Sequence, residues 1–242
     1  QQAIKNNLHL IDGAFRQSRT AAHIFLDILR APAGVALALR SMHELGVLGA
    51  YVPEFKTLNC LVQYNRYHIY TADEHTLVTL DNLEYLSRAE ALPSDSKHVK
   101  HVFDEIQQKE LLYLALLMHD VGKSARGEDH SQVGAKMARN FLQRLGLSQE
   151  EINTVVFLVE QHLTMSHIAQ RRDLNDQNML SDFALRFNRP NTLRMLYVLT
   201  YADLSAVTRT AWTAWKGHLL QECYQKTFVH LTQEDPQTDI EK

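Results

Sequence analysis

The longest apolar segment of the chain is Leu111-Leu112-Tyr113-Leu114-Ala115-Leu116-Leu117-Met118, which is followed at once by His119-Asp120. Its apolar run is far shorter than the roughly 20 residues that a membrane span requires. A segment that is apolar on every side is typical of a helix enclosed by other helices. A charged Asp at the end of such a helix loses its hydration, which costs free energy unless a partner compensates for the buried charge. We therefore expect a central buried helix that leads directly into a polar site.

Helical spacing of apolar residues recurs along the rest of the chain, whereas the alternation of a strand is scarce. Only nine Gly and five Pro interrupt the sequence. Ser148 and Glu151 have the spacing of a capping box, which marks the start of a helix. We expect loops at 49–70, 92–96 and 122–129, and an all-α fold. The further predicted helices cover Phe15–Arg30, Pro32–Leu45, Asp73–Leu86, His130–Leu145, Ser148–Leu163, Gln177–Phe187, Asn191–Ser205 and Thr210–Leu231.

Composition excludes several classes of protein. The 242 residues are 45% hydrophobic and 22% charged, which is too apolar and too near neutrality for a disordered chain. A formal charge of −3, with His neutral, gives no general attraction to nucleic acid. Cys60 and Cys223 are too few for a disulfide framework and fit a reducing cytoplasm. The N-terminus has no apolar signal region and no initiator Met. We expect a cytoplasmic protein that binds neither nucleic acid nor membrane, cut from a longer chain.

The 13 His residues justify a search for a metal site. Imidazole nitrogens and carboxylate oxygens suit Zn, Mn, Fe, Co or Ni, and Mg is tolerated where oxygens dominate. For any single His, a capping or packing role is the alternative. Asp120 and Asp203 both interrupt apolar helices, which favours a shared metal site over separate structural roles. The candidate ligands are His75, His119, Asp120, His130, His162 and Asp203.

The order of His75, His119-Asp120 and Asp203 resembles the H…HD…D signature of the HD-domain metal-dependent phosphohydrolases. That signature is broad, but longer phrases are specific. They are similar to the HD domain of bacterial bifunctional PII uridylyltransferase/uridylyl-removing enzymes, and the similarity covers nearly the whole chain. The phrases are Leu39–Met42, Gly46–Gly49, Tyr67–Thr76, Lys109–Ala115, Gln161–Ser166, Ala169–Asp173, and Trp212 with Trp215-Lys216.

The resemblance implies an HD-domain helical fold with an N-terminal helical connector. We expect the connector at 1–58, the HD hydrolase domain at 59–232 and a polar tail at 233–242. In this family a nucleotidyltransferase domain precedes the connector, and ACT domains follow the HD domain. The chain has no Gly-Ser pair for the nucleotidyltransferase motif and no βαββαβ pattern after Leu231. We therefore expect it to be the middle of such a protein.

The resemblance also implies an activity, which is hydrolysis of the phosphodiester that links UMP to a tyrosine of the PII signalling protein. Metal-activated water would attack phosphorus, with uridylylated PII protein as substrate and UMP as product. One or two divalent ions would be needed, Mn or Mg ahead of Fe, Co, Ni or Zn. The first ion would be held by His75, His119, Asp120 and Asp203, and a second by His130 and His162 with Asp120 as the bridge.

Fixed cations are also needed, because charge neutralisation supplies much of the acceleration in phosphoryl transfer. Lys123 follows Asp120 by three residues, and Gly122 between them would let the loop bend back toward the metal. We expect Lys123, together with Asp120, to act in catalysis by holding the scissile phosphate.

Further phosphate-binding candidates are Arg126, Arg171 and Arg172, since Arg contacts phosphate oxygens in a bidentate manner. For the Arg171-Arg172 pair, a solvated position beside Asp173 is an equal alternative. Two other function classes also stay open. An HD phosphohydrolase of free nucleotides or cyclic dinucleotides would use the same metal site. A non-catalytic regulatory module would keep it for structure only, although the complete ligand order argues against that.

Overall fold

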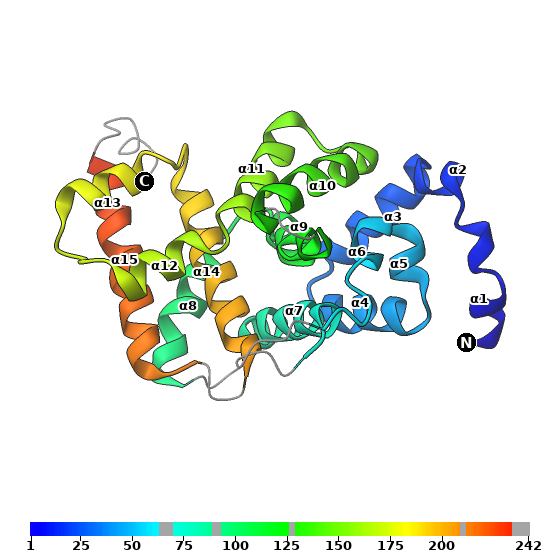
Figure 1. The fold of residues 1–242 in the computed structure, drawn as a ribbon, viewed down its shortest axis with the longest axis horizontal. Coiled ribbons are helices and arrows are strands. Elements are labelled where there is room, and N and C mark those ends of the chain that lie inside the picture. Colours follow the sequence, from blue (N-terminus) through cyan, green and yellow to red (C-terminus); the bar gives the residue numbers. More distant parts are fainter. Residues whose placement is uncertain (63–69, 89–92, 126–128, 209–211, 234–242) are drawn as a thin grey trace.

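The computed structural model describes residues 1–62, 70–88, 93–125, 129–208 and 212–233. Figure 1 shows an elongated molecule, with the N-terminal helices at one end and the C-terminal helices at the other. Within these ranges every regular element is helical and none is a β-strand, so the predicted all-α fold is confirmed. No helix among the described residues is long and apolar enough to cross a lipid bilayer.

Short helices build the first part of the chain. The loop predicted at 49–55 is wrong, because two helices of five and four residues lie there. Gly46, in the left-handed conformation with φ of 79°, separates them from the preceding helix. Helices of barely one turn show no apolar periodicity, so no pattern in the sequence indicated them. The elements are α1 (Gln2–Asn6), the 3-10 helix η1 (Leu8–Leu10), α2 (Gly13–Arg16), α3 (Arg19–Arg30), α4 (Val35–Glu44), α5 (Val47–Tyr51) and α6 (Pro53–Lys56).

The middle of the chain contains the helices around the predicted polar site. Ser148 and Glu151 exchange hydrogen bonds as the predicted capping box. The side chain of Asp129 caps the helix that begins at His130, and Gly146 ends that helix with φ of 73°. The break predicted at 92–96 is shorter than expected, because a helix begins at Ser94. The elements are α7 (Ala72–Arg88), α8 (Ser94–Asp104), α9 (Lys109–Met118), the 3-10 helix η2 (Val121–Ser124), α10 (His130–Leu145) and α11 (Gln149–Gln161).

Four helices complete the described chain. The first of them was not predicted, because only two residues separate it from α11 and its pattern merges with that helix. Pro190 occupies the first turn of the third, where a missing N–H has no cost. The elements are α12 (Thr164–Arg171), α13 (Gln177–Ala184), α14 (Pro190–Val207) and α15 (Ala214–Gln233).

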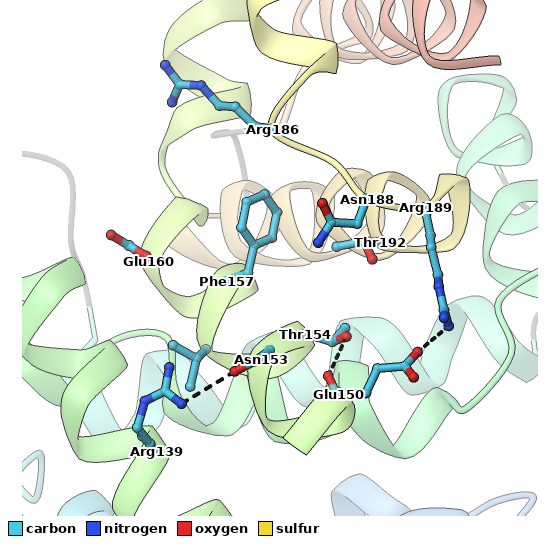
Figure 2. A pocket seen from close by; sticks show the side chains of 11 residues that line it. Arg139, Glu150, Asn153, Thr154, Phe157, Glu160, Arg186, Asn188, Arg189 and Thr192 are labelled. Atoms are coloured by element: carbon cyan, nitrogen blue, oxygen red, sulfur yellow. Dashed lines mark hydrogen bonds and ion pairs between the residues drawn. The ribbon is translucent and has the colours of Figure 1, made fainter. Parts of the chain in front are cut away.

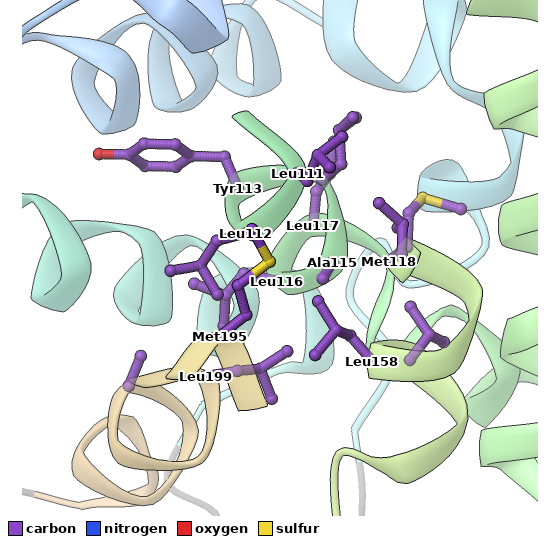
Figure 3. Packing of buried hydrophobic residues seen from close by; sticks show 14 of the residues in the cluster. Leu111, Leu112, Tyr113, Ala115, Leu116, Leu117, Met118, Leu158, Met195 and Leu199 are labelled. Carbon is purple, nitrogen blue, oxygen red and sulfur yellow. The ribbon is translucent and has the colours of Figure 1, made fainter. Parts of the chain in front are cut away.

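Helix α9 is the centre of the core, as its sequence predicts. Every residue from Leu111 to Met118 is at most 5% exposed. The helix packs against α3 and α7 from the first half of the chain and α11 and α14 from the second. Figure 3 shows its Leu112 and Leu116 beside Met195 and Leu199 of α14. Truncating one such Leu to Ala typically costs roughly 2–5 kcal/mol. This packing fixes the end of α9, from which the polar site begins.

Candidate metal centre

Six His and Asp side chains converge where α9 ends. They form two groups of three, and within each group the possible ligand atoms lie within 4.8 Å of one another. Three helices, α7, α10 and α14, contribute one residue each, and the other three residues directly follow α9 or α11 or precede η2. The first group is His75, His119 and Asp203, and the second is Asp120, His130 and His162.

Most of these side chains come from helix ends. His75 lies in the first turn of α7, and His130 is the first residue of α10. His119 and His162 directly follow the last residues of α9 and α11. Helix ends bring side chains together from several directions while the apolar faces behind them stay packed in the core. The buried residues of α9 and α11 therefore hold these two imidazoles in place.

The same backbone contact orients both of the imidazoles that follow helices. The Nδ1 atom of His119 lies 2.7 Å from the carbonyl oxygen of Leu116. The Nδ1 atom of His162 lies 2.7 Å from that of Val159. A carbonyl oxygen only accepts, so each Nδ1 must carry the proton and donate it. The lone pair of each ring then lies on Nε2, which is the form that binds a metal ion.

Asp120 lies between the two groups. Its Oδ2 atom is 3.3 Å from Nε2 of His119 and 3.8 Å from Nε2 of His75. Its Oδ1 atom is 3.9 Å from Nε2 of His162. One carboxylate oxygen thus faces the first group and the other faces the second. This is the arrangement that a bridging carboxylate requires.

His75 and Asp203 close the first group across the core. The Nε2 atom of His75 lies 2.9 Å from Oδ1 of Asp203, and Nε2 of His119 lies 3.8 Å from the same oxygen. His75 and His119 are almost fully buried, whereas the side chain of Asp203 is 16% exposed. Asp203 is therefore the member of the first group whose side chain is partly exposed to solvent.

Burial and mutual charge set the protonation of the site. Burial lowers the pKa of His119, but the carboxylates of Asp120 and Asp203 outweigh this and the net pKa is raised. Burial raises the pKa of Asp120, but His119 and Lys123 bring it well below its usual value. The pKa of Asp203 is also lowered, because its hydrogen bond to His75 outweighs its burial. Both carboxyl groups are therefore ionised.

The second group keeps its imidazoles neutral. Burial, with a contribution from His119, lowers the pKa of His162 to about 4. Burial also lowers the pKa of His130, although Asp120 opposes the shift. Neutral imidazole is the state in which His binds a metal ion.

The donor set fits a divalent metal ion. The Nε2 atoms of His119, His130 and His162 are buried and have no hydrogen-bond partner among the described residues. Buried polar atoms without partners are rare in native proteins and require an explanation. Imidazole nitrogens mixed with carboxylate oxygens suit first-row transition metals and tolerate Mg. A metal ion would satisfy these atoms and the two carboxylates together.

The loop after Asp120 is held against α10 by two glycines. A Cβ atom on Gly122 would overlap the carbonyl oxygen of His130 and lie 2.6 Å from the backbone nitrogen of Gly134. On Gly134, a Cβ atom would lie 3.4 Å from the backbone nitrogen of Gly122. Gly122 is thus needed for close approach to α10, rather than for the tight bend that the sequence suggested. This contact fixes His130 relative to His119-Asp120.

Of the predicted phosphate-binding residues, Lys123 lies at the site. Its Nζ atom is 2.6 Å from Oδ2 of Asp120, and its side chain is 11% exposed. Arg126 lies outside the described residues. Arg171 and Arg172 are exposed at the end of α12, and neither belongs to the two groups.

A cavity of about 620 Å³ lies away from the two groups, between α10, α11 and the turn that leads into α14. None of the six residues lines it. Figure 2 shows Arg139, Arg186 and Arg189 around it, with Phe157 between them. All three guanidinium groups are engaged, because Arg139 donates to Asn153, Arg186 donates to Gln161 and Arg189 pairs with Glu150. No sequence pattern indicated this cavity, because its lining residues have no recognisable spacing.

The convergence of His75, His119-Asp120 and Asp203 agrees with a comparison of the sequence with protein families. The family described as HD domain matches residues 72–203, which is more than half of the chain. The chain belongs to the HD-domain family. HD domains bind divalent metal ions, as the two groups of His and Asp residues lead one to expect. The first part of the chain matches a second family, described as Uridylyltransferase GlnD third domain, over residues 1–51.

Curated relatives of this HD domain carry a more specific name. The chain is 44% identical over 224 residues to a bifunctional uridylyltransferase/uridylyl-removing enzyme of Methylococcus capsulatus, an alignment that covers 93% of the chain and 25% of the relative. It is 42% identical over 228 residues to the enzyme of the same name from Cereibacter sphaeroides, covering 94% of the chain and 24% of the relative. The chain thus spans about a quarter of the length of these relatives.

These findings confirm the resemblance that the sequence phrases indicated. Both the HD-domain family and the uridylyl-removing relatives support the expected enzyme class, a metal-dependent phosphohydrolase. The metal ligands and the phosphate-binding residues remain predictions about this chain.

Proposed function

We propose that the chain is a metal-dependent phosphodiesterase that removes UMP from a tyrosine of uridylylated PII signalling protein. The observation that carries the proposal is the convergence of six His and Asp side chains in a chain over 40% identical to uridylyl-removing enzymes. Water attacks phosphorus, the bond to the tyrosine oxygen breaks, and that oxygen takes up a proton. UMP and the unmodified PII protein are the products.

His75, His119, Asp120 and Asp203 would hold one divalent ion, Mn or Mg. His130 and His162 would hold a second, with Asp120 shared between them. A bound divalent ion lowers the pKa of a coordinated water and draws charge from a phosphoryl oxygen. The opposed orientation of the two Asp120 oxygens supports its role as the shared ligand.

Lys123 would neutralise the scissile phosphate. Its ammonium lies at 2.6 Å from Asp120 and retains some exposure, so it is at the edge of the site and accessible to a substrate. A carboxylate that also binds metal ions attracts the ammonium of Lys123 less strongly, so the ammonium is available to a phosphate oxygen. Arg126, Arg171 and Arg172 would come second to Lys123 in this role.

The same proposal includes the organisation of the chain. We infer a helical connector at 1–58, an HD hydrolase domain at 59–232 and a polar tail at 233–242, in a protein of the cytoplasm. The two family matches, at 1–51 and 72–203, support a division between them. Within the connector, α4 packs against α7 and α6 packs against α10, so the two parts are in contact.

The test is release of UMP from uridylylated PII protein by the chain in Mn²⁺ or Mg²⁺. We expect release by the wild type, none by His119→Ala, and little activity on a panel of free nucleotides and cyclic dinucleotides. If a free nucleotide were hydrolysed faster than uridylylated PII protein, that nucleotide would be the substrate instead. Metal binding without hydrolysis of any of these compounds would favour a non-catalytic module.

A further inference from the structure

The helix that carries His75 is held from behind by α4. The guanidinium of Arg40, on α4, donates from Nη1 to both carboxylate oxygens of Glu74, at 2.9 and 3.0 Å. Its Nη2 donates to Oδ2 of Asp81 at 2.6 Å. Glu74 directly precedes His75, and Asp81 lies two helical turns further along α7. One side chain thus joins the first turn of α7 to the turns behind it.

The start of α7 needs such support. The first amide groups of a helix have no partners within it, so the first turn is the part that frays most readily. His75 is the fourth residue of α7. Its neighbour Asp73 is buried and accepts a hydrogen bond from the backbone of Cys60 at 3.1 Å. The Nε2 atom of His43, also on α4, lies 3.4 Å from the same Asp73 oxygen.

A second contact fixes how far α4 lies along α7. The buried carboxylate of Glu84 accepts hydrogen bonds from the backbone N–H groups of Gly34 and Ala36. These are the first amides of α4, which has no side-chain cap of its own. Glu84 and Glu74 are separated by ten residues, or about 15 Å of helix. A slide of α4 along α7 would break the contacts at both ends, so their relative position is fixed.

We propose that Arg40 is a positioning residue for the metal centre. It holds the first turn of α7, so that His75 stays aligned with Asp203 and His119. Arg40 touches none of the six converging residues and acts only through Glu74 and Asp81. The inference rests on the proposed metal-binding role of His75. It also makes α4, within the part of the chain that matches the GlnD third domain, a route by which rearrangement of that part reaches the metal centre.

A matched control lies between another pair of helices, α6 and α10. Arg144, on α10, forms a bidentate ion pair with Glu54 of α6 at 2.7 and 2.9 Å. The side chain of Arg144 is 25% exposed and that of Arg40 is 26% exposed, so the two have equal burial. Arg144 lies at the opposite end of α10 from His130. Arg144→Ala should therefore remove a comparable inter-helix ion pair without disturbing either group.

The experiment titrates MnCl₂ into chelator-treated protein by calorimetry, with circular dichroism and thermal unfolding measured on the same samples. Replacing a residue that hydrogen-bonds a metal ligand typically costs 10- to 100-fold in metal affinity. Arg40 contacts Glu74, the neighbour of His75, and not the ligand itself, so we expect an effect at the lower end of this range. We expect about 10-fold weaker Mn²⁺ binding for Arg40→Ala. Arg144→Ala should lower the unfolding temperature by a similar amount and leave Mn²⁺ affinity within twofold.

Glu74→Gln keeps the size and shape of the side chain that Arg40 contacts, and it is the test variant if Arg40→Ala does not fold. It should also weaken Mn²⁺ binding, and the double variant Arg40→Ala/Glu74→Gln should be no weaker than Arg40→Ala alone, because the contact is already lost. Unchanged Mn²⁺ affinity in folded Arg40→Ala or Glu74→Gln would overturn the inference, as would an equal loss in Arg144→Ala. If the wild type binds no Mn²⁺, the proposed metal-binding function fails instead.

Discussion

Nε2 of His75 lies 2.9 Å from Oδ1 of Asp203, although 128 positions separate the two residues in the sequence. Between them the chain passes through α8, α9, α10 and α11 before α14 brings Asp203 back. The first group of ligands therefore exists only when both halves of the domain are packed on α9. The predictions below follow from this arrangement and from the residues around it.

Replacing Asp120 with Ala should abolish bound metal, and replacing His119 with Ala should abolish the first ion, with helical content largely intact in both variants. Each is almost fully buried and faces the other group members, but neither packs the apolar core. Elemental analysis of protein purified without chelator, with circular dichroism, measures both effects. Full metal content in both variants would show that these residues are not ligands.

A second ion should be visible by its stoichiometry. At saturating Mn²⁺ the wild type should bind two ions, and His162→Ala should bind one, because Asp120 still faces the first group. Bridged ions of this kind lie roughly 3.5–4 Å apart and couple magnetically. Electron paramagnetic resonance of the Mn²⁺ protein tests the coupling, and one uncoupled ion in the wild type would contradict it.

Lys123→Ala should bind metal normally and release UMP from modified PII protein far more slowly. Its ammonium contributes most where charge develops on the phosphate, so kcat should fall more than substrate affinity. Loss of one such group typically costs about 10²–10³ in rate. Turnover like that of the wild type, with metal confirmed, would exclude Lys123 and direct attention to Arg171 and Arg172.

Gly122→Ala should destabilise the protein, because its Cβ would overlap the backbone of His130 and Gly134. Overpacking of this kind costs about 1–3 kcal/mol, and it should also displace His130 and weaken the second ion. Gly13→Ala is the control, since nothing lies within 4 Å of a Cβ there. Thermal unfolding that is equally affected in the two variants would contradict the close approach of the loop to α10.

Metal-free protein should lose stability on acidification between pH 6.5 and about 4. The pKa of His162 is about 4 when folded, whereas an unfolded His titrates near pH 6.5. In this window the unfolded chain binds more protons, so its free energy falls relative to the folded state by roughly 3 kcal/mol in all. The free energy of unfolding, measured by chemical denaturation at several pH values in this range, should change less steeply with pH in His162→Gln than in the wild type. The raised pKa of His119 acts in the opposite direction above pH 6.5, outside the window.

The sequence predicted the parts of the fold that a single long pattern determines. The all-apolar run of α9 identified the central helix, and the Ser148 and Glu151 spacing identified the start of α11. The helices α1, α5, α6, α8 and α12 were not predicted. All but α8 have eight residues or fewer, and α8 begins inside the polar stretch at 92–96 that was expected to be a loop. Their positions depend on tertiary packing and on Gly46, which no local periodicity records.

The candidate site could be predicted by residue but not by arrangement. Helix ends and interrupted apolar helices indicated all six His and Asp residues, which the structure brings together. That Asp120 lies between the groups, with Lys123 against it, depends on distances between helices far apart in sequence. The ion pairs of Arg40 with Glu74 and Asp81 could not be predicted from local sequence either, because a single Arg on an amphipathic helix resembles any solvated charge.

The burial of α9 on every side also has a consequence for synthesis of the protein on the ribosome. Met118 is made before Pro190, the first residue of α14, by several seconds at roughly 5–20 residues per second. Early in that interval an eight-residue apolar stretch has only α3 and α7 to cover it, and α10 and α11 are added before α14. The nascent chain then exposes an apolar segment to which chaperones bind. A chain truncated before α14 would aggregate rather than form a smaller folded domain.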